Sequence, residues 1–250
     1  MLNKMIRRAM LMLSLLPFFA VTAQAADTVQ ILTQNYPPFS MSANDKNFER
    51  EDGIEGIDKE VVVEMFKRAD VPYQMTLRFP WSRLQEMAEK QRDFAVFSLS
   101  RSAQRESRYK WVGPLSEIQM VLLKMPGNPI SLESLDDARK YNIGSVAGTS
   151  VSQYLAKRNF NVKTVLTGAP AKLKAGEFDL WATTNPAGDF ESIKAGVGKL
   201  EVAYSVSTTE LYLAMNKETP DEVVQKLQSA LDQMRKEGFI HQVATRYLNN

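Results

Sequence analysis

The sequence contains no cysteine and only one histidine, His241. Without cysteine the chain can form neither a disulfide nor a thiol nucleophile, and zinc sites of the usual cysteine and histidine type are excluded. One histidine leaves a single base for a Ser-His-Asp triad, and it lies beside Ile240 and Val243, which favours a packing or surface role. We therefore expect a protein without catalytic residues, cofactors or metal ions.

The chain also lacks any run of lysine and arginine and any low-complexity tract. Its 31 basic and 29 acidic residues nearly balance, and 28 basic residues remain against 29 acidic ones when Lys4, Arg7 and Arg8 are left out. Binding of nucleic acid requires a concentrated basic face. Nucleic acid is therefore not expected as a partner.

Only one long apolar stretch is present, from Ala9 to Val21. It follows the three basic residues just named and precedes the small-residue sequence Ala23-Gln24-Ala25, an order typical of a cleavable secretory signal. The stretch is shorter than the about 20 residues that a transmembrane helix needs. We expect residues 1–25 to be removed, which leaves a periplasmic protein of roughly 225 residues with no cysteine for a lipid anchor.

Short β-branched or aromatic segments alternate with segments of helical periodicity along the rest of the chain, which is typical of an α/β fold. The expected strands are Val29–Thr33, Gln74–Phe79, Phe94–Phe97, Gln119–Lys124, Tyr141–Val146, Val162–Leu166, Asp179–Thr183 and Leu211–Met215. The expected helices are Lys59–Ala69, Ser82–Lys90, Leu132–Lys140, Val151–Arg158, Ala171–Ala175 and Ala187–Lys194. Thr219 is expected to cap a C-terminal helix that begins at Pro220, and Met41 to Gly53 is expected to be an exposed loop.

Two segments, Met87 to Ser98 and Leu173 to Thr184, correspond to one another. Each is expected to hold a helix, a tight turn, a strand that begins near an aspartate, and a hydroxyl at the strand end. In open α/β sheets ligands bind beyond the carboxyl ends of the strands, so Ser98 and Thr184 would face a common cleft. Helix-turn-strand units recur in every α/β protein, however. Judged on this correspondence alone, ordinary recurrence of such units is the favoured explanation.

Several short motifs follow one another in order over nearly the whole chain after residue 25. They are Asn35-Tyr36-Pro37-Pro38-Phe39, Gly56-Ile57-Asp58, Ser98-Leu99-Ser100-Arg101-Ser102-Ala103-Gln104-Arg105, Val112-Gly113-Pro114-Leu115, Ala147-Gly148-Thr149-Ser150, Ala175-Gly176-Glu177-Phe178-Asp179 and Lys236-Glu237-Gly238-Phe239-Ile240. In these motifs and their order the sequence resembles the family 3 extracellular solute-binding proteins that serve polar amino acid ABC transporters.

The resemblance implies a type II periplasmic-binding-protein fold, in which two α/β lobes are joined by a hinge with two chain crossings. Lobe 1 would comprise residues 26–115 and 209–250, and lobe 2 residues 116–208, with crossings near Leu115 to Ile118 and Val206 to Glu210. The lobes would close on a small polar solute that carries a carboxylate, an amino acid or a relative of one. The protein would act as a monomer and deliver the solute to an inner-membrane ABC permease.

In lobe 1 the resemblance places ligand contacts at Tyr36, Trp81, Ser98, Ser100 and Arg105. Tyr36 and Trp81 would sandwich the solute, as aromatic walls do in many small-molecule sites, although Trp81 is equally compatible with a core residue at a helix start. Arg105 would clamp the ligand carboxylate with Ser100 and the Ser98 backbone, because a guanidinium presents paired donors that fit a carboxylate. The alternative is an ordinary arginine on the solvated surface.

In lobe 2 the resemblance points to Gly148, Thr149, Ser150 and Thr184. The first three lie between a strand and a helix, where backbone N–H groups attract an anion, and a helix-capping role is compatible with this. Thr184 stands where the family usually has an aspartate that meets the ligand ammonium, and a hydroxyl cannot supply that charge. Either the solute is acidic or carries an uncharged amine, or the ammonium anchor has moved to Asp189, Glu191 or Glu117.

Two other functions remain compatible with the sequence. Similar folds include periplasmic dehydratases of cyclohexadienyl acids, which would use a glutamate in the cleft as an acid. They also include binding proteins that dock onto a membrane sensor instead of a transporter. The small inventory of catalytic side chains disfavours the enzyme.

Overall fold

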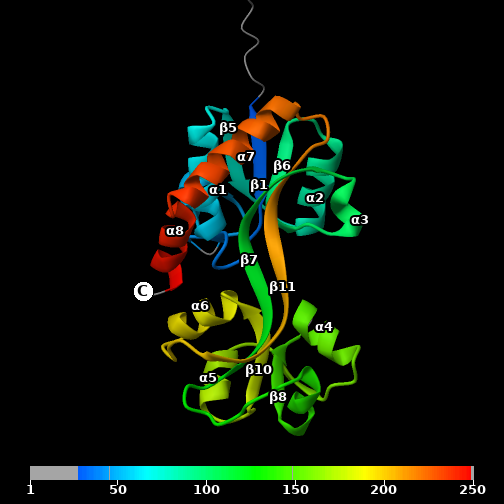
Figure 1. The fold of residues 1–250 in the computed structure, drawn as a ribbon, viewed down its shortest axis with the longest axis vertical. Coiled ribbons are helices and arrows are strands. Elements are labelled where there is room, and N and C mark those ends of the chain that lie inside the picture. Colours follow the sequence, from blue (N-terminus) through cyan, green and yellow to red (C-terminus); the bar gives the residue numbers. More distant parts are fainter. Residues whose placement is uncertain (1–27, 45, 148, 249–250) are drawn as a thin grey trace, which may run out of the picture.

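The computed structural model describes residues 28–44, 46–147 and 149–248. They form two α/β lobes connected by two long strands, as Figure 1 shows, so the two-lobed α/β architecture expected from the sequence is confirmed. The expected signal segment, residues 1–25, lies outside the described residues. None of the described helices is long and apolar enough to cross a membrane.

The upper lobe in Figure 1 contains three parallel strands, β1 (Val29–Thr33), β5 (Tyr73–Leu77) and β6 (Phe94–Ser100). Strand β1 is buried on both faces: Ile31 packs into the core beneath α1 (Ile57–Arg68), α7 (Asp221–Lys236) and α8 (Phe239–Leu248), and Leu32 packs beneath α2 (Trp81–Lys90). Burial on both faces explains why the adjacent residues Ile31 and Leu32 are both apolar. The shorter elements of this lobe are β2 (Met41–Ser42), β3 (Glu49–Arg50), η1 (Glu51–Gly53), β4 (Ile54–Glu55) and α3 (Ala103–Glu106).

The lower lobe repeats this arrangement with the parallel strands β8 (Ile143–Val146), β9 (Val162–Val165) and β10 (Leu180–Asn185). Strand β10 is also buried on both faces. Leu180 packs with Leu155 of α4 (Ser150–Ala156), whereas the fully buried Trp181 packs with Leu173 of α5 (Ala169–Lys174). The 3-10 helix η2 (Leu135–Lys140) and α6 (Ala187–Lys194) complete the lobe.

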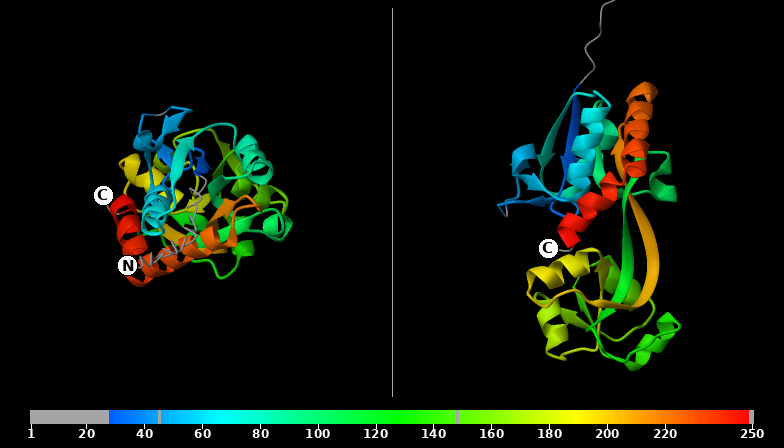
Figure 2. Two further views of the ribbon diagram at one scale, coloured as in Figure 1. Left: turned by 90° about the horizontal axis from the view of Figure 1, so that it is seen from above. Right: turned by 60° about the vertical axis from the view of Figure 1, so that its left-hand side comes forward.

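Two antiparallel strands of 15 residues each, β7 (Lys110–Lys124) and β11 (Glu201–Met215), run through both lobes (Figures 1 and 2). They lie in the middle of one nine-stranded sheet of order β3-β5-β1-β6-β11-β7-β10-β8-β9. The two expected crossings lie side by side, since Glu117 is opposite Glu210 and Ile118 is opposite Thr209. Register shifts bound this segment on β11, between Ser205 and Ser207 and between Leu211 and Leu213, and such irregularities bend strands. The expected lobe boundaries fall within it and remain a prediction.

The sequence predicted only the ends of these two strands, Gln119–Lys124 and Leu211–Met215. The remainder of β11, from Glu201 to Glu210, is rich in polar side chains, and Gly113 and Pro114 interrupt the remainder of β7. Both segments are mostly exposed or half-buried, so they lack the apolar signal of a core strand. Pairing of the two strands with each other overrides the weak local preference.

Three local predictions are wrong. Thr219 does not cap the C-terminal helix: Pro220 occupies the cap position, and the Thr219 hydroxyl is buried with no partner among the described residues. Only Leu135–Lys140 of the expected helix Leu132–Lys140 is helical, and as a 3-10 helix. The expected loop Met41 to Gly53 contributes β2, which pairs with β4, and β3, which pairs with β5.

The start of α1 is docked onto the turn that carries Tyr36. The Ile57 N–H donates to the Pro38 carbonyl at 2.8 Å, and the Asp58 N–H donates to the Phe39 carbonyl at 3.0 Å. Gly56 makes this approach possible, because it has φ of +129° and a Cβ there would lie 2.4 Å from the Phe39 carbonyl oxygen. The backbone at this point therefore tolerates only glycine.

We predict that Gly56→Ala destabilises the protein much more than Gly127→Ala. Gly127 also has a positive φ, +77°, but nothing lies within 4 Å of its missing Cβ, so its replacement should cost about 1–2 kcal/mol from backbone strain alone. Gly56→Ala adds a clash with backbone atoms and should cost at least about 2 kcal/mol more. Urea unfolding of both variants measures the difference, and equal destabilisation would contradict the docking described here.

Candidate functional site

A cavity of about 340 Å³ lies between the two lobes. Its walls are Tyr36 and Pro37 from the upper lobe and, from the lower lobe, Val146, Thr149, Ser150, Val151, Ala182, Thr183, Thr184, Ala187 and Glu191. Four of the predicted ligand contacts, Tyr36, Thr149, Ser150 and Thr184, are thus brought together. Tyr36 follows the carboxyl end of β1, Thr149 and Ser150 follow that of β8, and Thr184 lies in β10 next to its carboxyl end. This is the edge at which an open α/β sheet binds its ligands.

Tyr36 is held in place by a tight turn. Its N–H donates to the Ser40 carbonyl at 2.6 Å, and the Phe39 N–H donates to the Tyr36 carbonyl at 2.9 Å. The Tyr36 hydroxyl interacts with the Thr184 side chain across the cleft. Burial and the nearby charge of Asp58 raise the pKa of Tyr36, and the contact with Thr184 partly offsets this. The tyrosine therefore connects the two lobes as a neutral hydroxyl.

Thr149 uses its hydroxyl to cap α4. The Thr149 Oγ1 accepts from the Ser152 N–H at 3.2 Å and donates to the Val146 carbonyl at 2.9 Å. The capping role considered from the sequence is confirmed, and the hydroxyl still lies in the cavity wall. Gly148, also predicted as a contact, lies outside the described residues.

Arg105 and Ser100, predicted as partners, lie together. The Arg105 Nη1 donates to the Ser100 Oγ at 2.9 Å and to the Ser100 carbonyl at 3.1 Å. No carboxylate in the described part of the chain pairs with Arg105, and the residue does not line the cavity beside Tyr36. The neighbouring Arg101 is engaged differently, since it pairs with Glu106 and lies over the rings of Trp111 and Tyr212.

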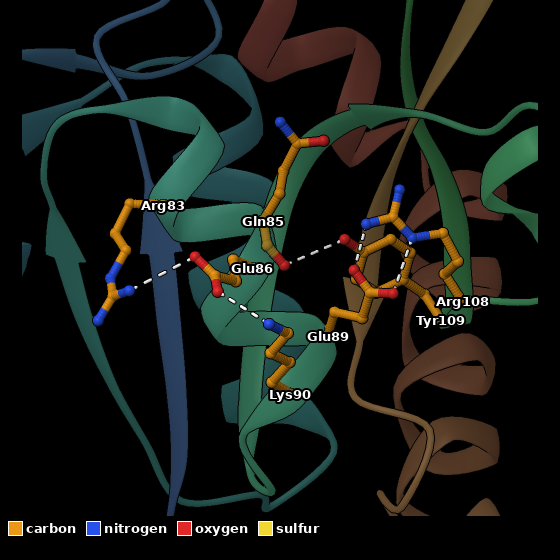
Figure 3. A network of polar contacts seen from close by, with 7 residues as sticks. All are labelled: Arg83, Gln85, Glu86, Glu89, Lys90, Arg108 and Tyr109. Carbon is orange, nitrogen blue, oxygen red and sulfur yellow. Dashed lines mark hydrogen bonds and ion pairs between the residues drawn. The ribbon is translucent and has the colours of Figure 1, made fainter.

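A polar network holds α2 against the segment that follows Arg105 (Figure 3). Arg108 forms a two-pronged ion pair with Glu89 of α2, in which Nε donates to Oε1 at 2.9 Å, and the Tyr109 hydroxyl donates to the Gln85 carbonyl at 3.1 Å. Trp81, the first residue of α2, is half-buried against the core beneath that helix. Trp81 does not line the cavity. Its position in the structure agrees with the second interpretation from the sequence, a core residue at the start of a helix.

Ser98 donates a hydrogen bond to Asp58, a buried carboxyl that was not among the residues predicted for the site. Its Oγ donates at 2.6 Å to Oδ2 of Asp58, which is completely buried at the start of α1. Ser116 of the hinge strand β7 approaches the same carboxyl without full hydrogen-bond geometry, and the Asp58 Oδ1 has no partner among the described residues. Burial raises the pKa of Asp58 to about 7, although the two serines partly oppose this. The motif Gly56-Ile57-Asp58 was the available signal.

The three acids proposed as displaced ammonium anchors differ in position. Asp189 is buried and accepts from the Asn185 amide at 3.2 Å, and burial raises its pKa. Glu117 lies on the hinge strand and lines two other hollows. Glu191 alone lines the cavity with Tyr36 and Thr184, and burial raises its pKa as well.

Comparison with known proteins gives one family match and many solved structures of the same fold. The profile described as bacterial extracellular solute-binding proteins, family 3, matches residues 29–250. The second substrate-binding domain of a putative amino acid ABC transporter from Streptococcus pneumoniae aligns with a TM-score of 0.70 and 16% identity over 88% of this chain and 99% of that chain. No curated protein matches the sequence.

Two further structures share the fold. The arginine-, lysine-, histidine-binding protein from the thermophilic bacterium Geobacillus stearothermophilus gives a TM-score of 0.61 at 18% identity, covering 89% of this chain and 96% of that chain. A histidine kinase sensor domain with similarity to periplasmic binding proteins gives 0.64 at 16% identity, covering 90% and 97%. At these identities the likeness shows the fold alone, and the expected type II periplasmic-binding fold is confirmed.

We predict that Asp58 makes the protein less stable as the pH rises from about 4 to about 7. The unfolded aspartate ionises near pH 3.9, whereas the folded one keeps its proton until about pH 7, so unfolding releases a proton throughout this window. The loss should approach about 4 kcal/mol and stop above pH 7. In Asp58→Asn the loss should disappear. Urea unfolding of both proteins from pH 4 to 8.5 tests this, and a difference between them that is constant with pH would contradict it.

Proposed function

Because the chain belongs to the bacterial extracellular solute-binding proteins of family 3, we propose that it captures a small polar solute for delivery to an inner-membrane ABC permease. The solute carries a carboxylate and is an amino acid or a relative of one. The cavity shared by Tyr36 of one lobe and Thr149 and Thr184 of the other carries this proposal. A solute that contacts both lobes stabilises their closed arrangement. The Streptococcus pneumoniae domain of the same fold, from a putative amino acid transporter, supports the solute class.

Each lobe has a defined part in this proposal. Arg105, presented by Ser100, takes the carboxylate. Among the described residues only its Nη1 donates hydrogen bonds within the fold, so its other donors remain for a ligand. Ser98 contributes its backbone, since its hydroxyl is engaged with Asp58. Tyr36 and Trp81 flank the aliphatic part of the solute. The lower lobe contributes the hydroxyls of its strand ends and helix starts, at Thr149, Ser150 and Thr184. Gly148, which precedes them in the sequence, is proposed as a further ligand contact.

We also propose that the protein is exported through residues 1–25 and acts in the periplasm as a monomer. The family description as extracellular supports export. The proposed lobes are residues 26–115 with 209–250 and residues 116–208. Their boundaries fall in the part of the β7–β11 ladder that lies between two register shifts, and this position supports the proposal.

Two other functions each have one observation in their favour. The first is a ligand-sensing partner of a membrane receptor, and the similar fold of a histidine kinase sensor domain supports a link between this fold and sensing. A dehydratase of cyclohexadienyl acids would need an acid in the cleft, and Glu191 has a raised pKa there. Deletion of the gene distinguishes transport from sensing. Uptake of the solute is abolished only if the protein is a component of the transporter. Incubation with prephenate-like acids detects the dehydratase directly.

We predict that Arg105→Ala strongly weakens binding of the carboxylate solute without unfolding the protein. Loss of a charge-assisted clamp in a closed cleft should cost on the order of 2 to 5 kcal/mol. The solute is first identified by thermal shift among amino acids, dicarboxylates, amines and small cyclic acids, and its affinity is then measured by calorimetry. Arg83→Ala, which removes an exposed arginine of α2 (Figure 3), is the control. Affinity of Arg105→Ala within a factor of a few of wild type would show that the clamp is assigned wrongly.

We predict that the solute compacts the molecule. The hinge consists of two paired strands, so closure should rotate the two lobes as rigid units and reduce the radius of gyration. Small-angle X-ray scattering with and without saturating solute measures this. Arg105→Ala at the same solute concentration should keep the unliganded profile. An unchanged wild-type profile at saturation would exclude closure by the hinge.

A further inference from the structure

We infer that Glu191 selects solutes that carry a cationic amine, and that it replaces the aspartate expected at position 184 as the anchor of that amine. The inference rests on the proposed function, since it concerns the same interlobe cavity. It names both a specificity-determining residue and the chemical class of the group that enters this part of the site.

The cavity has one formal charge in its wall. Of its eleven lining residues, only Glu191 has a side chain that is normally charged near neutral pH. The others are apolar or carry hydroxyls. Glu191 is the fixed charge of this wall near neutral pH, because Asp58 behind Tyr36 keeps its proton until about pH 7. A cavity wall whose fixed charge is negative attracts a cation and repels an acid. Thr149 and Thr184 add oxygen atoms that can accept hydrogen bonds from an ammonium group.

The Glu191 carboxylate is not committed to another role. Throughout residues 28–44, 46–147 and 149–248, no side chain forms a hydrogen bond or ion pair with it. Its raised pKa has loss of solvation as its sole cause, which means that no cation of the protein compensates its charge. Much of the Glu191 side chain is exposed at the cavity wall, so a ligand can reach the carboxylate. A ligand ammonium would supply the missing counter-charge.

The position of Glu191 explains how an anchor can move while the cavity is kept. Thr184 is the penultimate residue of the strand β10, the chain turns at Pro186, and α6 begins at Ala187. Glu191 is therefore on the second turn of α6, and both it and Thr184 reach the same cavity. Tyr36 lies in the opposite wall, and its hydroxyl, which contacts the Thr184 side chain, offers a further hydrogen-bond acceptor to a cationic group.

The other two candidate anchors are excluded by their surroundings. Asp189 is turned toward Asn185, and both Lys199 and the Leu200 backbone stabilise its charge. Glu117 lies opposite Glu210 on the hinge strands and does not line this cavity. Of the acids that the sequence suggested, only Glu191 has both access to the cavity and a free carboxylate.

The test is calorimetric titration of wild type, Glu191→Gln and the control Glu133→Gln with three matched groups of compounds. The first group is the standard amino acids, the second is the amines cadaverine, putrescine and agmatine, and the third is the amine-free acids succinate, glutarate and hexanoate. Glu133 is an exposed glutamate of the same lobe, away from the cavity. Thermal unfolding of each variant first establishes that it is folded.

We expect wild type to bind at least one amine-bearing compound and none of the amine-free acids. Glu191→Gln should lower that affinity at least tenfold, and Glu133→Gln should leave it unchanged. If an amine-free acid binds as tightly as its amine-bearing counterpart, or if Glu191→Gln binds within threefold of wild type, the role of Glu191 is refuted and the solute-binding function stands. If no compound of any group binds wild type, the proposed function fails, and this inference fails with it.

Discussion

The pairing of β7 with β11 is the interaction on which the architecture depends. The two strands supply core residues to both lobes: Val112 and Leu213 belong to the upper core, and Val121 and Leu123 to the lower one. Neither lobe could therefore close its core without them. The connection is a hydrogen-bonded ribbon and not a flexible linker, so the relative motion of the lobes is restricted to bending and twisting of that ribbon. At its middle two like charges, Glu117 and Glu210, lie opposite each other, which weakens the pairing where bending is needed.

The cleft follows from the direction of the parallel strands. In each lobe these strands end toward the other lobe, so the turns after β1, β8 and β10 deliver their side chains to one shared space. Gly56 then fixes the Tyr36 turn against α1, and this contact also places Asp58 behind the tyrosine. Backbone geometry at one glycine thus positions both a cavity wall and a buried acid.

Much of the site could be predicted from the sequence, because its residues lie in short motifs at strand ends. Tyr36, Thr149 and Thr184 were named and lie in one cavity, and Arg105 was paired with Ser100. What the sequence could not provide depends on tertiary surroundings. The complete burial of Asp58 results from packing of α1, β6 and β7, and no local pattern reports it. The full lengths of β7 and β11 were missed for a similar reason, since partner strands and not apolar periodicity maintain them.

The contact of Tyr36 with Thr184 across the cleft has a kinetic consequence. Under the proposed function, a solute that must break this contact to reach the cavity has an association rate constant equal to the encounter rate multiplied by the fraction of molecules in which the contact is open. A bound solute likewise leaves only after Tyr36 and Thr184 have separated. The dissociation rate constant of every solute, whether it binds tightly or weakly, then has a common ceiling, which is the rate at which the two lobes separate.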